Sequence, residues 1–97
     1  IVMARGRFAW DDVGSWSALA NHFPKDLRGN VVVGQGEMLD SSGNIVVADT
    51  GLVALIGVQD LVVVKTGAAT LVCRKDRAQD VKRMVAQLRR RGAHEVL

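Results

Sequence analysis

Two adjacent carboxylates, Asp11 and Asp12, stand between the two tryptophans of this 97-residue chain, Trp10 and Trp16. Large aromatic side chains bury extensive apolar area, whereas an ionised carboxylate resists burial unless a partner compensates its charge. A segment that combines the two kinds of side chain therefore predicts a helix cap, a solvated turn or a bound cation. Gly14 follows closely and would let the backbone approach a ligand.

Three interpretations of the acidic pair are consistent with the residue types. Asp12 or Ser15 could cap a following helix by accepting from its first free N–H groups. Both carboxylates could instead be solvated turn residues. In the third interpretation one of them helps to hold a divalent cation such as Mg²⁺, which takes oxygen ligands and often only one or two protein carboxylates. One aspartate would then form half of a metal site.

Length and composition indicate one small globular domain. The hydrophobic share is 48% and the charged share 24%, both ordinary for such a domain. No apolar run approaches the roughly 18 residues of a membrane-spanning helix. The single cysteine, Cys73, lies in an apolar run and predicts a buried small hydrophobe without a catalytic role. A lone cysteine also favours a reducing, cytoplasmic location, and the absence of an initial Met leads us to expect a segment of a larger protein.

Basic residues are concentrated at the C-terminal end. Residues 1–73 carry five Lys/Arg and seven Asp/Glu, whereas residues 74–97 carry eight and three. This basic end motivates one alternative function, a small nucleic-acid-binding domain. All four aromatic residues lie within 8–23, and single-strand binders usually stack bases on aromatic side chains. We therefore expect no nucleic-acid partner, and no membrane partner.

Short Val, Ile and Leu runs alternate with turn residues from Gly29 to Cys73. The runs lie at 31–33, 37–39, 45–48, 52–56, 61–64 and 70–73, with Gly, Asn, Asp and Ser between them. This spacing predicts an all-β unit. Several runs are continuously apolar, so both faces of their strands are covered, as in a sandwich, a barrel or the coils of a β-helix. The pattern does not choose among these three.

Helical patterns flank the β-unit. Trp16, Leu19 and Ala20 fall at i, i+3 and i+4 and predict a helix over about 15–22, preceded by a strand end or linker in 1–8. Asp76-Arg-Ala-Gln79 resembles a capping box. Val81, Met84, Val85 and Leu88 then predict an amphipathic helix over 77–91, with Gly92 ending it. The predicted fold class is mainly β with two helices.

One stretch carries a resemblance to a known family. Phe8-Ala-Trp-Asp-Asp-Val-Gly-Ser-Trp16 resembles the C-terminal signature of mannose-1-phosphate guanylyltransferases, which belong to the sugar-nucleotide pyrophosphorylase family. The likeness continues through Gly29-Asn-Val31, Gly57-Val-Gln-Asp-Leu-Val-Val-Val64 and Leu71-Val-Cys73 into the final helix. It covers residues 8–91 and departs from the family pattern at Ala68, where relatives often have Asp.

The resemblance implies a nucleotidyltransferase that makes GDP-mannose from GTP and mannose 1-phosphate and releases pyrophosphate. It implies a Mg²⁺ cofactor bound by two aspartates, one of which matches Asp12, with Asp11 as its neighbour. It also implies that Trp10 lies beside the sugar pocket and that Gly14 closes the turn. No catalytic side chain beyond the metal ligand is implied.

The family architecture divides the chain in two. Residues 1–28 would be the remnant of an α/β nucleotidyltransferase domain, with its last active-site strand, turn and linking helix. Residues 29–97 would be a small left-handed β-helix with terminal helix 77–91, which helps to form a homodimer. The family's Gly-rich nucleotide loop has no match, since a β run follows Gly34-Gln-Gly36. We expect the segment alone to be inactive; the alternative is a stand-alone dimerisation or interaction module without catalysis.

Overall fold

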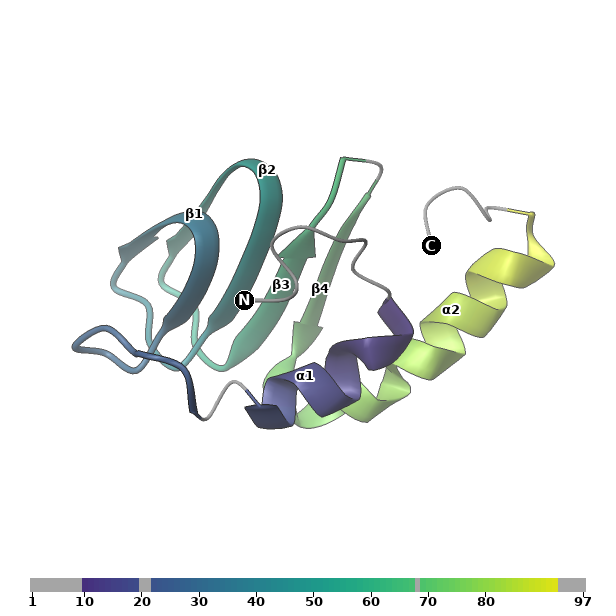
Figure 1. The fold of residues 1–97 in the computed structure, drawn as a ribbon, viewed down its shortest axis with the longest axis horizontal. Helices are drawn as coiled ribbons and strands as arrows, with labels where there is room; N and C mark the ends of the chain where they lie inside the picture. The colour runs from purple at the N-terminus through teal and green to yellow at the C-terminus, as the bar shows by residue number, and fades with distance from the viewer. Residues whose placement is uncertain (1–9, 20–21, 68, 93–97) are drawn as a thin grey trace.

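The structure, a computed structural model, describes residues 10–19, 22–67 and 69–92. A 3₁₀ turn, η2 (Trp10–Asp12), leads into α1 (Val13–Leu19). The four strands are β1 (Val31–Leu39), β2 (Ile45–Ile56), β3 (Leu61–Lys65) and β4 (Thr70–Arg74), and the 3₁₀ segment η4 (Lys75–Asp80) precedes α2 (Val81–Arg90). The expected fold class, mainly β with two helices, is confirmed (Figure 1). Within the described ranges, no helix is long and apolar enough to cross a membrane.

The strands form one open sheet in the order β1-β2-β3-β4. β1 pairs with β2, and β2 with β3, in parallel, whereas β3 and β4 are antiparallel. Val31, Ile45 and Val62 occupy equivalent positions in successive strands. Figure 1 shows β1 and β2 bending back over themselves as two stacked arches. The arches are the coils of a β-helix, and the open sheet rules out the barrel that the apolar runs had left possible.

Two of the predicted turns lie inside strands. Gly34 belongs to β1 and Gly51 to β2, both at positive φ, and the β1–β2 register breaks between Val33 and Gln35. A Cβ at Gly34 would lie 2.2 Å from the carbonyl oxygen of Ala48, so only glycine fits there. Six apolar runs therefore make four strands, because the chain turns each corner without leaving the sheet.

Two buried asparagines join the coils at the start of successive strands. Asn30 and Asn44 are 1% and 0% exposed. The Asn30 Oδ1 accepts from the Asn44 backbone N–H at 2.8 Å and from its Nδ2 at 3.1 Å. The Asn44 Oδ1 in turn accepts from the Leu61 N–H at 2.9 Å, and its Nδ2 donates to the Val58 carbonyl at 3.2 Å. This asparagine ladder satisfies backbone groups that the coil corners would otherwise bury without partners.

Asp26 ends the ladder on the β1 side. Its carboxylate accepts from the Asn30 Nδ2 at 2.9 Å, from the Asn30 N–H at 2.8 Å and from the Arg28 N–H at 2.9 Å. The bonds from Asn30, first its side chain and then its backbone, hold the pKa of Asp26 below its ordinary value. A charged acceptor thus replaces the amide that a preceding coil would supply.

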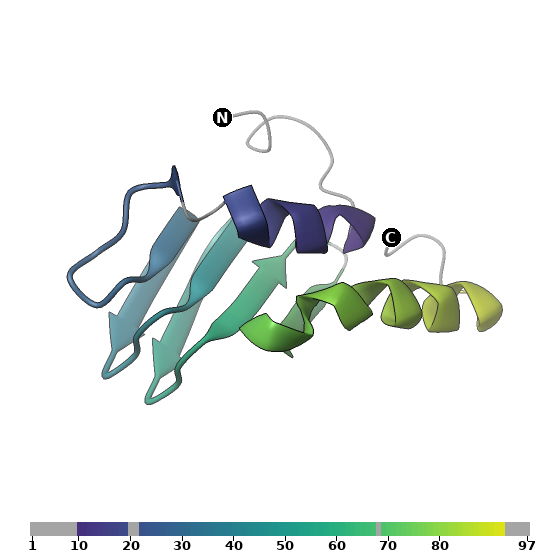
Figure 2. The same cartoon turned by 90° about the horizontal axis from the view of Figure 1, so that it is seen from below.

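The first half of β2 and the middle of β3 are buried on both faces of the sheet, whereas β1 and β4 are largely exposed on one face. One face packs with α1 and α2 into a core of Trp10, Val13, Val31, Ile45, Val47, Val62, Val64, Leu71, Ala78, Val81 and Val85. A smaller cluster on the other face, inside the arches, contains Val46, Ala48, Val53 and Val63. Figure 2 shows both helices on the same side of the sheet. The described part of residues 1–28 therefore shares one core with the β-unit.

Both helices begin at other residues than the sequence pattern predicts. α1 begins at Val13, so Ser15 lies inside the helix and does not cap it. The capping box at Asp76 and Gln79 is wrong: neither η4 nor α2 has a side-chain cap, and Asp76 instead accepts from Arg74 at 2.7 Å. A 3₁₀ segment fills 75–80, so the α-helix begins four residues later than expected. The predicted end is confirmed, because the Gly92 N–H donates to the Arg89 carbonyl with Gly92 at φ 83°.

We expect Asn44→Ala to lower the free energy of unfolding by about 3 kcal/mol or more. The substitution leaves the Leu61 N–H and the Val58 carbonyl buried without their partner, and each orphaned group costs about 1–3 kcal/mol. Urea denaturation followed by circular dichroism measures the loss. Gln35→Ala is the matched control, since this amide is exposed and should change stability by no more than about 0.5 kcal/mol. Equal stability of both variants would show that the ladder is dispensable.

Candidate metal and substrate site

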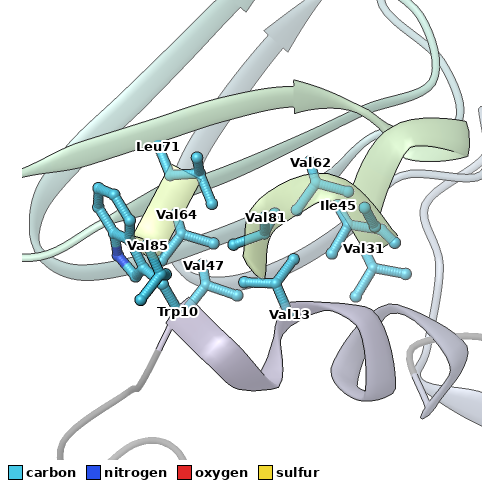
Figure 3. Packing of buried hydrophobic residues seen from close by; sticks show 11 residues of the cluster. Trp10, Val13, Val31, Ile45, Val47, Val62, Val64, Leu71, Val81 and Val85 are labelled. Carbon is cyan, nitrogen blue, oxygen red and sulfur yellow. The ribbon is translucent and has the colours of Figure 1, made fainter. Parts of the chain in front are cut away.

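The first turn of the described chain separates an acidic side chain from apolar ones. Trp10 and Val13 are 5% and 0% exposed, whereas Asp12 is exposed. Residues three apart share one side of a 3₁₀ turn, so burial of Trp10 and Val13 directs Asp12 away from the core. Figure 3 shows the side chains of Trp10 and Val13 pointing into the cluster of strand valines. Asp12, the predicted metal ligand, is therefore exposed on a turn whose opposite side is held in the core by Trp10 and Val13.

Asp12 belongs to no cluster of three or more candidate metal ligands (His, Cys, Asp or Glu) among the residues that the structure describes. A single accessible carboxylate fits the expectation of half a Mg²⁺ site, because Mg²⁺ is often held by only one or two carboxylates. The side chain of Asp11 lies outside the described part of the structure, so its role as a neighbour stays a prediction.

Gly14 lies against η4 and is half-buried. A Cβ at this position would approach the Gln79 side chain to 3.3 Å, which is tighter than ordinary contact. The Gly14 carbonyl also accepts from the Ser17 hydroxyl at 2.9 Å. Close packing between α1 and η4 thus accounts for a small residue here, and a role for Gly14 in substrate binding stays a prediction. No pattern in the sequence identifies Gln79 as its neighbour.

Trp10 is a core residue in this structure. Its ring packs with Val64, Leu71 and Val85 in the helix-covered cluster (Figure 3). Its Nε1 is buried and has no hydrogen-bond partner among the described residues, which is rare because buried polar groups are nearly always paired. The expected place beside a sugar pocket is a prediction about the longer enzyme, while the packing of the ring is a property of this chain.

Ion pairs neutralise part of the basic C-terminal segment. Arg74 pairs with Asp76 at 2.7 Å, and Arg77 and Arg83 both pair with Asp80, the latter at 3.6 Å. The hydrogen bond between Arg77 and Asp80 raises the pKa of Arg77 and lowers the pKa of Asp80. These side chains are exposed, so each pair contributes little to stability. The basic C-terminal segment is therefore partly neutralised by ion pairs with its own aspartates.

Cys73 has the packing that its apolar surroundings predict. It is half-buried, packs against the helix-covered core and pairs with Val62 across β3 and β4. Burial raises the pKa of its thiol. Because the thiolate is the reactive form, these surroundings favour an inert structural thiol.

Comparison with known proteins identifies this architecture as a β-helix domain associated with sugar-phosphate enzymes. The MannoseP isomerase/GMP-like beta-helix domain family matches residues 29–88. This match takes in all four strands and most of α2. The chain belongs to that family.

Individual relatives agree with this assignment. The chain is 45% identical over 86 residues to a mannose-1-phosphate guanylyltransferase of Klebsiella pneumoniae, covering 89% of this chain and 18% of the relative. It is 43% identical to the alginate biosynthesis protein AlgA of Pseudomonas aeruginosa, with the same two coverages. These relatives confirm the resemblance on which the sequence prediction was based. The chain spans about a fifth of the length of the curated relatives it matches.

A solved structure shares the fold as well as the sequence. The crystal structure named mannose-1-phosphate geranyltransferase, from Thermus thermophilus, matches with a TM-score of 0.70 at 48% identity. The match covers 87% of this chain and 26% of that one. The similarity in sequence and the similarity in fold therefore lead to the same family assignment.

We expect the two simplest substitutions of Trp10 to separate the packing of its ring from the pairing of its N–H group. Trp10→Ala should lower the free energy of unfolding by about 3–5 kcal/mol, since it empties the centre of the core. Trp10→Phe keeps an aromatic ring and removes the unpaired donor, so the loss should stay below about 1.5 kcal/mol. Urea denaturation of the two variants and the parent chain measures both values. Similar losses in the two variants would contradict this assignment.

Proposed function

We propose that this chain is the C-terminal portion of a mannose-1-phosphate guanylyltransferase, in which it supplies one metal-binding aspartate, Asp12, and a β-domain for assembly. The observation that carries the proposal is the exposed carboxylate of Asp12 on a turn whose other side is anchored in the β-helix core. The identities of 45% and 43% to the Klebsiella and Pseudomonas relatives support it.

The proposed reaction joins two phosphate groups. A phosphate oxygen of mannose 1-phosphate attacks the α-phosphorus of GTP, and the bond to the β-phosphate oxygen breaks, so that GDP-mannose forms and pyrophosphate leaves. Both reactants are anionic, and a Mg²⁺ ion supplies charge stabilisation as they approach. Asp12 would hold that ion together with an aspartate from outside this chain. Trp10 and Gly14 would position the turn beside the sugar.

A segment with one metal-binding aspartate and no nucleotide loop should not catalyse this reaction alone. Phosphoryl transfer depends on positioning of both reactants and on their charge stabilisation. This chain offers one carboxylate for that purpose among the residues that the structure describes. Catalysis would therefore belong to the longer enzyme, and the contribution of this segment is to fix Asp12 in place.

We expect Asp12→Ala to abolish most activity in a chimera that carries this segment in place of the matching 86 residues of the Klebsiella relative. Loss of a metal ligand removes several kcal/mol of charge stabilisation, so kcat/KM should fall about a hundredfold or more. Release of pyrophosphate from GTP and mannose 1-phosphate, measured against Mg²⁺ concentration, gives the value. Ser15→Ala is the control, an exposed residue of the adjoining helix α1 that should leave turnover unchanged. Unaltered Mg²⁺-dependent turnover by the Asp12 variant would reject the metal role.

A specific surface supports the proposed assembly role. The returning halves of β1 and β2 expose Leu39, Leu52 and Ile56, which are 57%, 54% and 70% exposed. Leu39 and Ile56 are paired neighbours in the register, so they form one apolar patch on the outer side of the arches. Exposed apolar patches of this kind mark interaction sites, and a symmetric homodimer through this face would cover it.

We expect the chain to sediment as a dimer at tens of micromolar and Ile56→Lys to shift it to monomer. A lysine at the centre of an isologous apolar contact places two like charges together. Sedimentation velocity over a concentration series measures the change. Thr50→Lys, an exposed polar position of β2, is the matched control and should remain dimeric. A folded parent chain that is monomeric throughout the series would exclude dimerisation by this domain alone.

A further inference from the structure

β4 is the edge strand of the sheet in the part of the chain that the structure describes. It pairs only with β3 among the described strands. The Thr66 N–H donates to the Ala69 carbonyl and the Lys75 N–H to the Asp60 carbonyl. In an antiparallel pair such bonds recur at every second residue. The backbone groups of Thr70, Val72 and Arg74 therefore face away from β3, toward the open edge.

A hollow of about 440 Å³ lies beside this edge, between β4 and α2. We call this hollow the β4–α2 groove. It is lined by Trp10, Ala69, Thr70, Leu71, Val72, Met84, Leu88 and Arg91. Val72 and Met84 are 58% and 41% exposed, although the sequence pattern placed Met84 on the buried stripe of the helix. A strand edge next to an apolar helix face is the arrangement that receives an added β-strand in several peptide-binding domains.

Trp10 gives an independent sign that the groove is incomplete. Its Nε1 is a donor that finds no acceptor within residues 10–19, 22–67 and 69–92, in a side chain that is only 5% exposed. Such orphaned donors are rare in folded proteins. The exposed Met84 lines the same groove, and a methionine side chain adapts readily to the shape of a bound partner.

The charge of the groove selects its partner. Arg91 is exposed on its lining, and the exposed Arg74 follows Val72 along the same edge. Arg74 is already paired with Asp76, which leaves Arg91 as the charge that a partner would meet. β4 of a second copy, Thr70–Arg74, carries no acidic side chain that could pair with Arg91. An acidic and apolar segment of different sequence fits the groove better. The relatives have most of their length outside the matched region, since this chain spans 18% of the Klebsiella enzyme.

We propose that the β4–α2 groove receives an extended segment from the remainder of the longer enzyme, which adds to the sheet as a strand beside β4. One of its apolar side chains fills the hollow, an acidic side chain meets Arg91, and an oxygen acceptor pairs with the Trp10 N–H. This docking rests on the proposed function in that it requires the longer polypeptide. It would join the β-helix to the rest of the enzyme through backbone hydrogen bonds in addition to the chain connection.

Site-resolved hydrogen exchange tests the docking by comparing the 97-residue chain with the Klebsiella chimera. The outward amides of Thr70, Val72 and Arg74 should exchange at least about tenfold more slowly in the chimera. Val72→Lys in the chimera should restore the fast exchange of the Thr70 and Arg74 amides. Leu27→Lys, at a fully exposed apolar position, is the matched control and should not. Unchanged exchange of the Val46 and Val63 amides shows in the same data that each variant is folded.

Three results would overturn the docking. The first is equal exchange of the β4 amides in the chimera and in the 97-residue chain. The second is slow exchange in the 97-residue chain that becomes fast when residues 93–97 are removed, since the occupant is then the chain's own end. The third is protection that rises with the concentration of the 97-residue chain, which identifies a second copy. Turnover is measured separately, so an active chimera with unprotected β4 amides rejects the docking and retains the proposed function.

Discussion

The stacking of one coil on the next depends on the two buried amides of the asparagine ladder. Each amide stands just before a strand, next to a residue with positive φ, Gly29 or Gly43. Asp60, also at positive φ, repeats the geometry before β3. The N–H groups of Gly43 and Asp60 donate to backbone carbonyls of the preceding coil. The next N–H groups along the chain, those of Asn44 and Leu61, take side-chain partners instead. Asn30 and Asn44 provide these partners and thereby fix the register of all three parallel strands.

Register then determines which side chains meet the helices. A one-residue slip would move every inward valine of a strand to its opposite face. With the ladder in place, Val31, Ile45 and Val62 align across β1, β2 and β3 beneath α1 and α2. Trp10 and Val13 dock on this surface, and their burial sets the direction of Asp12. The position of the proposed metal ligand therefore follows from hydrogen bonds made at the coil corners.

The sequence predicts the strands and the helix end because these depend on local patterns. Val and Leu runs, interrupted by turn residues, indicate β-structure, and Gly92 ends a helix by its own conformational freedom. The corner at Gly34 is different, since the same glycine would serve a turn, and only contact with Ala48 in the next coil shows that the strand continues. The capping box at Asp76 and Gln79 fails for a similar reason: Arg74 takes the carboxylate and the packing of Gly14 places Gln79.

The sequence shows the candidate site as a motif, but it does not show which of the motif's side chains are buried and which are exposed. Two aspartates between tryptophans identify the family, but only the fold shows that Trp10 is buried while Asp12 is exposed. The open edge of β4 also depends on strand order, which no local pattern contains.

A Mg²⁺ site that takes one carboxylate from each of two regions of an enzyme requires both carboxylates to be held in precise positions. The ion requires near-ideal octahedral geometry, so a ligand on a mobile terminal segment would spend binding free energy on becoming ordered. Asp12 lies beside Trp10 and Val13, which are held by the same core that the β-helix builds from its strands. Backbone hydrogen bonds between coils make such a scaffold resistant to local opening. The β-helix would thus contribute to catalysis without contacting the substrates, because it restricts the conformations of Asp12 before the metal ion binds.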